Sequence, residues 1–136
     1  MSVGVVICMH GKLATELLNS AETIVGESQD IIPIDFAIND SSSQLLERYK
    51  RVIDKLNKDE ILFLVDVYGG SPFNIANKLA LINDNYSVIT GVNLSMMIET
   101  IEKLEGSNLN SLVEDILKRG KKSITNSKEN MKLNLE

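Results

Sequence analysis

One histidine and one aspartate stand where side chains can do chemistry. His10 is the only histidine of the chain and follows an apolar run at residues 3–9, and Asp66 follows a second apolar run at residues 61–65. The carboxyl ends of parallel strands meet at one edge of a sheet, where ligands bind. A carboxylate that accepts a proton from one imidazole nitrogen leaves the other nitrogen free to attack an electrophile. We therefore interpret His10 as a nucleophile that Asp66 orients.

The same residues allow three other interpretations. Both could be structural, with His10 bonding a backbone carbonyl and Asp66 capping a turn. Asp66 could itself take a phosphoryl group, as in a response-regulator receiver, but such domains need an acidic cluster after the first strand, where this chain has Met9, His10 and Gly11. Cys8 lies on the same strand face as His10, but one cysteine and one histidine are too few ligands for zinc. We therefore predict neither a metal nor a cofactor.

A glycine-rich turn follows Asp66. Gly69 and Gly70 permit close approach of the backbone, Ser71 offers an N-cap oxygen, and Pro72 suits the first helical position. The N–H groups and the Ser71 hydroxyl at the positive end of a helix would hold the oxygens of a phosphoryl group. A plain turn that only starts a helix is the alternative. The turn lacks the lysine of a Walker loop, and no Gly-x-Gly-x-x-Gly follows the first run, so the sequence disfavours a bound nucleotide.

Strand-like and helix-like segments alternate, which predicts an α/β fold with a mostly parallel open sheet between helices. The run at residues 61–65 is apolar throughout, as is typical of a central strand. We expect strands at residues 3–9, 31–36, 61–65 and 86–90. Helices are expected at residues 13–25, from a Ser41–Gln44 capping box to residue 56, at residues 71–82 and 95–104, and from a Ser111–Glu114 capping box to near Gly120.

Length and composition limit the function. A chain of 136 residues, 43% hydrophobic and 24% charged, fits one folded domain and neither disorder nor a fibre. The net charge of −5 argues against nucleic acid and favours a basic protein partner. No apolar stretch reaches the roughly 18 residues of a membrane span and no basic leader begins the chain, so we expect a cytoplasmic protein. Residues 121–136 are expected to add an edge strand and then a mobile tail.

Three segments together resemble the IIA domain of the mannose family of the bacterial phosphoenolpyruvate-dependent sugar phosphotransferase system. They are the strand that ends in His10-Gly11, the run from Leu62 to Asp66 with Gly69-Gly70-Ser71-Pro72-Phe73-Asn74, and Gly91-Val92-Asn93-Leu94. The resemblance implies one domain over residues 1–120 and, over residues 121–136, an edge strand exchanged across a homodimer and a tail. The family usually has proline where Ser95 stands, and we expect that serine to cap the following helix.

The resemblance also implies the roles of the site residues. His10 would accept a phosphoryl group from the carrier protein HPr and pass it to a IIB protein during sugar uptake, which makes the chain a phosphotransferase with a phosphohistidine intermediate. Asp66 would orient the histidine. The phosphate-side loop would consist of Gly11, Gly69, Gly70 and Ser71, and the docking surface would include Asp35, Phe36 and Phe73. The acceptor would be a separate protein, and the membrane subunits IIC and IID would take part only indirectly.

Two other functions fit the same pattern. Related IIA-like domains serve dihydroxyacetone kinases or transcriptional regulators, and a phosphate-free module that only binds proteins would need none of this chemistry. The run Gly-Gly-Ser-Pro-Phe-Asn at residues 69–74 and the length of the chain favour sugar transport. The sugar itself cannot be read from the sequence, because the resemblance implies that the IIA domain never contacts it.

Overall fold

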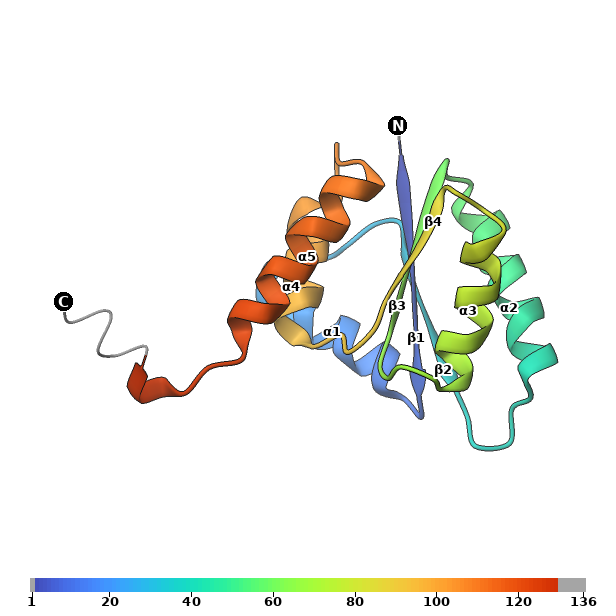
Figure 1. The fold of residues 1–136 in the computed structure, drawn as a ribbon, viewed down its shortest axis with the longest axis horizontal. Helices are drawn as coiled ribbons and strands as arrows, with labels where there is room; N and C mark the ends of the chain where they lie inside the picture. The colour runs from blue at the N-terminus through green and yellow to red at the C-terminus, as the bar shows by residue number, and fades with distance from the viewer. Residues whose placement is uncertain (1, 130–136) are drawn as a thin grey trace.

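A four-stranded parallel sheet forms the central layer of the fold, with helices on both faces (Figure 1). The structure is a computed structural model and describes residues 2–129. Its strands are β1 (Val3–His10), β2 (Ile31–Phe36), β3 (Glu60–Val65) and β4 (Tyr86–Ile89). The order β2-β1-β3-β4 places β1 and β3 inside the sheet, and every pairing is parallel. The predicted fold class and the central position of residues 61–65 are confirmed.

Within residues 2–123, five helices pack on the two faces of the sheet. They are α1 (Leu13–Val25), α2 (Ser42–Leu56), α3 (Ser71–Leu81), α4 (Leu94–Lys103) and α5 (Leu109–Ser123). Helices α1, α4 and α5 cover one face, and α2 and α3 cover the other (Figure 1). Within residues 2–129, no helix is long and apolar enough to cross a membrane.

Two apolar cores explain why the inner strands are apolar at nearly every position. Successive side chains of a strand point to opposite faces, so both faces of a covered strand must be apolar. Val5, Ile7 and Met9 of β1 belong to the core under α1, α4 and α5. Val6 and Cys8 belong to the core under α2 and α3. The alternation therefore directs the side chain of His10, the last residue of β1, to the face of the sheet that α2 and α3 cover.

The start of α2 was predicted correctly and the start of α3 was not. The Ser41 hydroxyl accepts the N–H of Gln44, and the Gln44 side chain accepts the N–H of Ser41, which confirms the capping box. In α3 the N-cap is Gly70, and Ser71 is already the first helical residue, so the predicted Ser71 cap is wrong. A glycine tolerates the N-cap position almost as well as serine does, and this allows the helix to begin one residue earlier.

Asparagines rather than serines cap α4 and α5. Asn93 accepts the N–H of Met96 at 3.0 Å, so the predicted Ser95 cap is wrong. Asn108 accepts the N–H of Ser111 at 2.9 Å, which places Ser111 in the first turn of α5 instead of at its N-cap. Asparagine and serine are about equally good N-caps, so a serine near the start of a helix does not by itself mark the cap.

The C-terminal part of the described chain is helical where an edge strand was predicted. Helix α5 continues through Gly120 to Ser123, and residues 124–129 contain no strand. Gly120 does not end the helix because it serves packing: a Cβ there would lie 2.7 Å from Sδ of Met96 on α4. The remainder of the predicted tail, residues 130–136, lies outside the described residues.

Candidate functional site

His10 is the last residue of β1, and a single carboxylate oxygen fixes both its backbone and its ring. The N–H of His10 donates to Oδ2 of Asp66 at 2.9 Å, and the ring Nδ1 lies 2.9 Å from the same oxygen. Since an ionised carboxylate only accepts, Nδ1 carries the proton and the lone pair is on Nε2. The side chain of His10 is 49% exposed and that of Asp66 is 13% exposed. The structure thus confirms the predicted juxtaposition and leaves Nε2 as the free nitrogen.

Asp66 is held in its charged form. Its second oxygen, Oδ1, accepts the N–H of Val67 at 3.0 Å. Partial burial acts to raise the pKa of Asp66, but the hydrogen bonds from the backbone and ring of His10, together with the charge of that ring, outweigh burial and bring the pKa below its ordinary value. A carboxylate that stays ionised at neutral pH stabilises positive charge on the imidazole when Nε2 forms a bond.

The imidazole lies directly over the start of α3. A Cβ placed on Gly70 would lie 2.9 Å from Cε1 of His10 and 3.5 Å from Nε2, so only glycine leaves room for the ring. Gly69, with φ of 88°, turns the chain into the helix. The first N–H groups of a helix have no partner within it, and they carry its positive dipole end. The structure therefore places Gly70 against the ring of His10, with Gly69 and Ser71 as its neighbours in the chain. That these residues form a phosphate-side loop remains a prediction.

Gly11, the fourth residue predicted for the phosphate side, is used differently. Its N–H donates to the carbonyl oxygen of Phe36 at 2.9 Å, so this N–H ties β1 to the end of β2. Its φ of 65° lies in the left-handed region, where glycine is favoured, and turns the chain toward α1. Gly11 thus shapes the loop after His10, and its N–H is bonded to Phe36 instead of being free to bind a phosphoryl oxygen.

A buried tyrosine, to which the sequence analysis assigned no role, anchors the start of α3. The Tyr49 hydroxyl donates to the carbonyl oxygen of Pro72 at 2.8 Å, and Tyr49 has no exposed surface. Burial raises the pKa of Tyr49, so the hydroxyl keeps its proton and remains a donor. Asn74 adds a second anchor, since its Nδ2 donates to the carbonyl oxygen of Gly69 at 3.0 Å. A tyrosine at a core position signals such a bond, because its hydroxyl needs a partner.

Two of the predicted docking residues lie beside the histidine loop or the start of α3. The ring of Phe36 meets that of His10 edge to face, with centroids 5.8 Å apart. Phe73 packs against Tyr68 with centroids 4.5 Å apart. The third predicted docking residue, Asp35, points elsewhere: its carboxylate accepts the N–H and the hydroxyl of Thr15 on α1.

The sequence analysis missed an apolar rim formed by Ile38, Val67 and Tyr68 in the loops at this edge of the sheet. Ile38 is 98% exposed, Val67 is 51% exposed and Tyr68 is 80% exposed. Val67 and Tyr68 directly follow Asp66, and Ile38 lies two residues beyond Phe36. Apolar side chains in loops that the fold leaves uncovered are the signal that could have indicated a protein contact.

Cys8 contributes no chemistry at the site. Burial raises the pKa of its thiol to about 12, so the sulfur stays protonated and is a poor ligand and nucleophile. Across residues 2–129, no group of three or more histidine, cysteine, aspartate or glutamate side chains is arranged to hold a metal ion.

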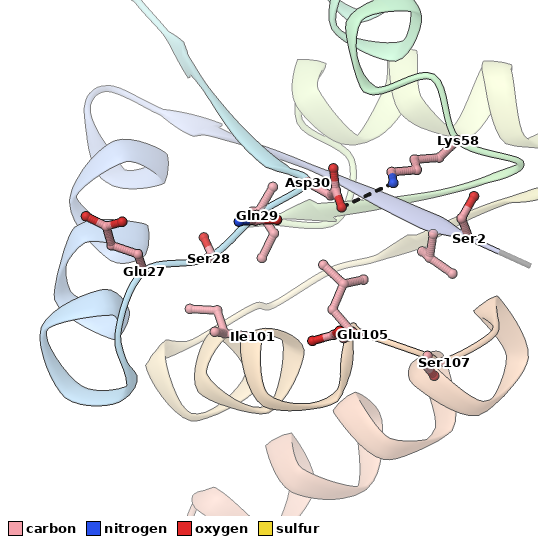
Figure 2. A pocket seen from close by; sticks show the side chains of 13 residues that line it. Ser2, Glu27, Ser28, Gln29, Asp30, Lys58, Ile101, Glu105 and Ser107 are labelled. Atoms are coloured by element: carbon pink, nitrogen blue, oxygen red, sulfur yellow. Dashed lines mark ion pairs between the residues drawn. The ribbon is translucent and has the colours of Figure 1, made fainter.

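A cavity of about 550 Å³ lies at the opposite edge of the sheet (Figure 2). Its walls come from the start of β1, the loop between α1 and β2, and the turn between α4 and α5. An ion pair between Lys58 and Asp30, 3.2 Å long, crosses one side of it. None of the predicted site residues lines this cavity.

Comparison with known proteins agrees with this geometry. The family model described as "PTS system fructose IIA component" (EIIA-man) matches residues 4–117. The chain is 40% identical over 102 residues to the "PTS system mannose-specific EIIAB component" of Escherichia coli (strain K12), which covers 74% of this chain and 32% of that protein. The match therefore spans about a third of that relative's length. It is 29% identical over 115 residues to the fructose-specific EIIA component of Bacillus subtilis (strain 168), covering 84% and 79% of the two chains.

The solved structures show the same fold. The crystal structure of phosphotransferase system component EIIA from Streptococcus agalactiae superimposes with a TM-score of 0.85 at 26% identity, over 93% of this chain and 98% of that one. The mannose/sorbose-specific IIA subunit from Enterococcus faecalis gives a TM-score of 0.84 at 26% identity, over 93% and 95% of the two chains. A family match across most of the chain, with the predicted histidine and carboxylate paired at the carboxyl edge of the sheet, shows that this chain belongs to the EIIA-man family of phosphotransferase system IIA components.

Proposed function

We propose that this chain is a phosphoryl carrier of a sugar phosphotransferase system and that Nε2 of His10 takes the phosphoryl group. The observation that carries the proposal is the bond between Nδ1 of His10 and the ionised Asp66, which directs the lone pair of Nε2 outward at a half-exposed position. The Nε2 lone pair forms the new bond to phosphorus. The bond between phosphorus and the donor breaks, and the donor atom keeps that electron pair.

The start of α3 supports the phosphoryl group once it is transferred. Gly70 lies against the ring, and Ser71 is the first residue of the helix and partly exposed. Phosphoryl oxygens near Nε2 would meet the positive end of α3 and the Ser71 hydroxyl. The hydrogen bond from Tyr49 to Pro72 keeps this helix start in place, so the N–H groups need not reorganise during transfer.

We further propose HPr as the donor and a IIB protein as the acceptor. The half-buried rings of Phe36 and Phe73, with the exposed apolar rim, offer a surface near His10 on which a partner can exclude water during transfer. Asp35 supports this surface through its neighbour Phe36 and not by direct contact. The net charge of −5 favours partners with a basic docking face, so their association should weaken as salt increases.

A homodimer with an exchanged C-terminal strand is also part of the proposal. Strand β4 is at the edge of the sheet, and residues 124–129 add no strand to it within their own chain. A strand from a second copy could pair there. Sedimentation equilibrium of the full chain tests the dimer, and a monomer at every concentration would contradict it.

Intact-mass analysis tests the carrier function directly. The chain is mixed with phosphoenolpyruvate, enzyme I and HPr, and His10→Ala is treated in the same way. We expect one acid-labile phosphoryl group on the wild type and none on the variant. His10 is half exposed, so the variant should remain folded, which circular dichroism can verify. An unmodified wild type, with HPr phosphorylated in the same tube, would favour the protein-binding module.

A further inference from the structure

The carboxylate of Asp35, near the end of β2, connects this strand to α1. Its Oδ1 accepts the N–H of Thr15 at 3.1 Å, and its Oδ2 accepts the Thr15 hydroxyl at 2.9 Å. On the other side, Nη1 of Arg48 on α2 donates to the carbonyl oxygen of Asp35 at 2.8 Å and to the carboxylate of Asp40 at 3.4 Å. Asp35 therefore links the end of β2 to the helices on both faces of the sheet.

Helix α1 depends on this contact for its first turn. Its N-cap residue, Lys12, makes no side-chain capping bond. Thr15 is the third residue of the helix, so its N–H has no partner within the helix and needs an acceptor from elsewhere. Asp35 supplies that acceptor from β2, and its negative charge suits the positive helix end. The loop of His10 and Gly11 leads straight into the turn that Asp35 fixes.

The same strand end sets the surroundings of the imidazole. Asp35 pairs with Met9, and Phe36 pairs with His10 in the register of β1 and β2. The carbonyl oxygen of Phe36 holds the N–H of Gly11, and the ring of Phe36 packs edge to face on that of His10. A shift of Asp35 would therefore move the backbone after His10 and the ring beside it together.

We propose that Asp35 is a positioning residue for phosphoryl transfer, which holds the start of α1 and the contact between Phe36 and His10, and is not a charge read by a docking partner. The proposal rests on the carrier function for its kinetic consequence only. Both oxygens of Asp35 already accept hydrogen bonds from Thr15.

Two substitutions separate positioning from docking. Asp35→Ala removes both bonds to Thr15, and we expect kcat for phosphorylation by phospho-HPr to fall about tenfold with little change in KM, since a displaced nucleophile loses orientation. Asp35→Asn should restore most of kcat, because its Oδ1 can accept the N–H of Thr15 and its Nδ2 can donate to the Thr15 hydroxyl. Equal losses in both variants, expressed in KM, would overturn the proposal.

Glu22 offers a matched control at the other end of α1. Its Oε2 accepts the N–H of Ser28 at 2.9 Å and the Ser28 hydroxyl at 2.8 Å, which repeats the pair of bonds made by Asp35. Glu22→Ala should loosen the end of α1 and leave kcat unchanged. If Glu22→Ala lowers kcat as much as Asp35→Ala does, a general loss of helix stability accounts for the effect and the proposal fails.

A measurement without phosphoryl transfer distinguishes this inference from the carrier function. Because His10 is the only histidine, its ring gives the only imidazole signals in a proton–nitrogen NMR spectrum. Asp35→Ala should shift these signals, whereas Asp35→Asn and Glu22→Ala should leave them near their wild-type positions. Unchanged signals in Asp35→Ala would overturn the positioning role. A wild type that HPr does not phosphorylate would overturn the carrier function and leave the NMR result intact.

Discussion

The two edges of the sheet each carry a carboxylate paired with a nitrogen base, and they differ in how the carboxylate is held. At the carboxyl edge, Asp66 is 13% exposed and accepts three bonds, two from His10 and one from the N–H of Val67. At the amino edge, Asp30 is 43% exposed in its pair with Lys58. In a parallel α/β fold, the helices that follow the strands begin at the first edge, so the positive ends of α1 to α4 lie on the side of Asp66 and His10. Helix α5 follows α4 directly and is the one described helix that begins at the second edge, where the N–H of Leu109 donates to Glu60.

The two edges also differ because the amino edge has a cavity, whereas the carboxyl edge has the candidate site. The amino edge has a cavity of about 550 Å³, and the acidic side chains of Glu27, Asp30 and Glu105 outnumber Lys58 among its charged lining residues. The carboxyl edge presents His10 at the surface, between apolar loops. A group that passes from one protein to another must be reached by both partners. An exposed nitrogen therefore serves this chemistry better than a nitrogen inside a cavity does.

The largest expected effect comes from removing each carboxylate in turn. Asp66→Asn should lower the rate of phosphorylation of His10 by about 10²- to 10⁴-fold, because the amide no longer fixes the tautomer or stabilises charge on the ring. Asp30→Asn should leave that rate unchanged. Rapid-quench kinetics with phospho-HPr measures both rates. Similar rates for the two variants would remove the functional difference between the edges.

A smaller effect is expected from adding one methyl group at each edge. Gly70 has an ordinary φ of −76°, so Gly70→Ala strains no backbone, but its Cβ would lie 2.9 Å from Cε1 of His10. We expect transfer to fall about 10- to 100-fold as the ring is displaced. Gly106, with φ of 77° and open space around its Cβ position, is the control.

Gly106→Ala should behave in the opposite way. The left-handed backbone should cost about 1 to 2 kcal/mol of unfolding free energy, while transfer stays at the wild-type rate. Urea denaturation and transfer kinetics on both variants give the two readouts. A normal transfer rate in Gly70→Ala would mean that the ring can move without loss.

The smallest effect concerns stability and pH. Because the pKa of Asp66 in the folded chain lies below its ordinary value of 3.8, the ionised group stabilises the fold above that value, and the stabilisation is lost as pH falls through the folded pKa. The difference in unfolding free energy between the wild type and Asp66→Asn should therefore be largest near neutral pH and shrink below about pH 4. Urea titrations at several pH values measure it. A difference that grows toward acid would contradict the assignment.

The sheet and the central pair could be predicted from sequence because each depends on local pattern. Strands that are buried on both faces are apolar throughout, and the two strands that end in His10 and Asp66 become neighbours once the sheet is parallel. The helix caps of α4 and α5 were missed because Asn93 and Asn108 compete locally with nearby serines, and sequence alone does not rank residues of equal capping strength.

The contacts that refine the site could not be predicted because they join distant residues. Asp35 and Thr15 are 20 positions apart, and Tyr49 and Pro72 are 23 apart. No periodicity encodes such pairs, since they depend on how β2 and α2 are placed relative to α1 and α3. The sequence therefore predicted which residues would react, whereas the structure adds the distant contacts around them.

The half-exposed ring of His10 has a consequence for the lifetime of a carried phosphoryl group. The side chain of His10 is 49% exposed, so water can reach the phosphorus–nitrogen bond whenever no partner is docked. The loaded protein would lose its group to hydrolysis at a steady rate, and the yield of transfer would depend on how soon the acceptor arrives. Acceptor concentration in the cell would then set the efficiency of the relay, and the carrier would work as a short-lived link and not as a store.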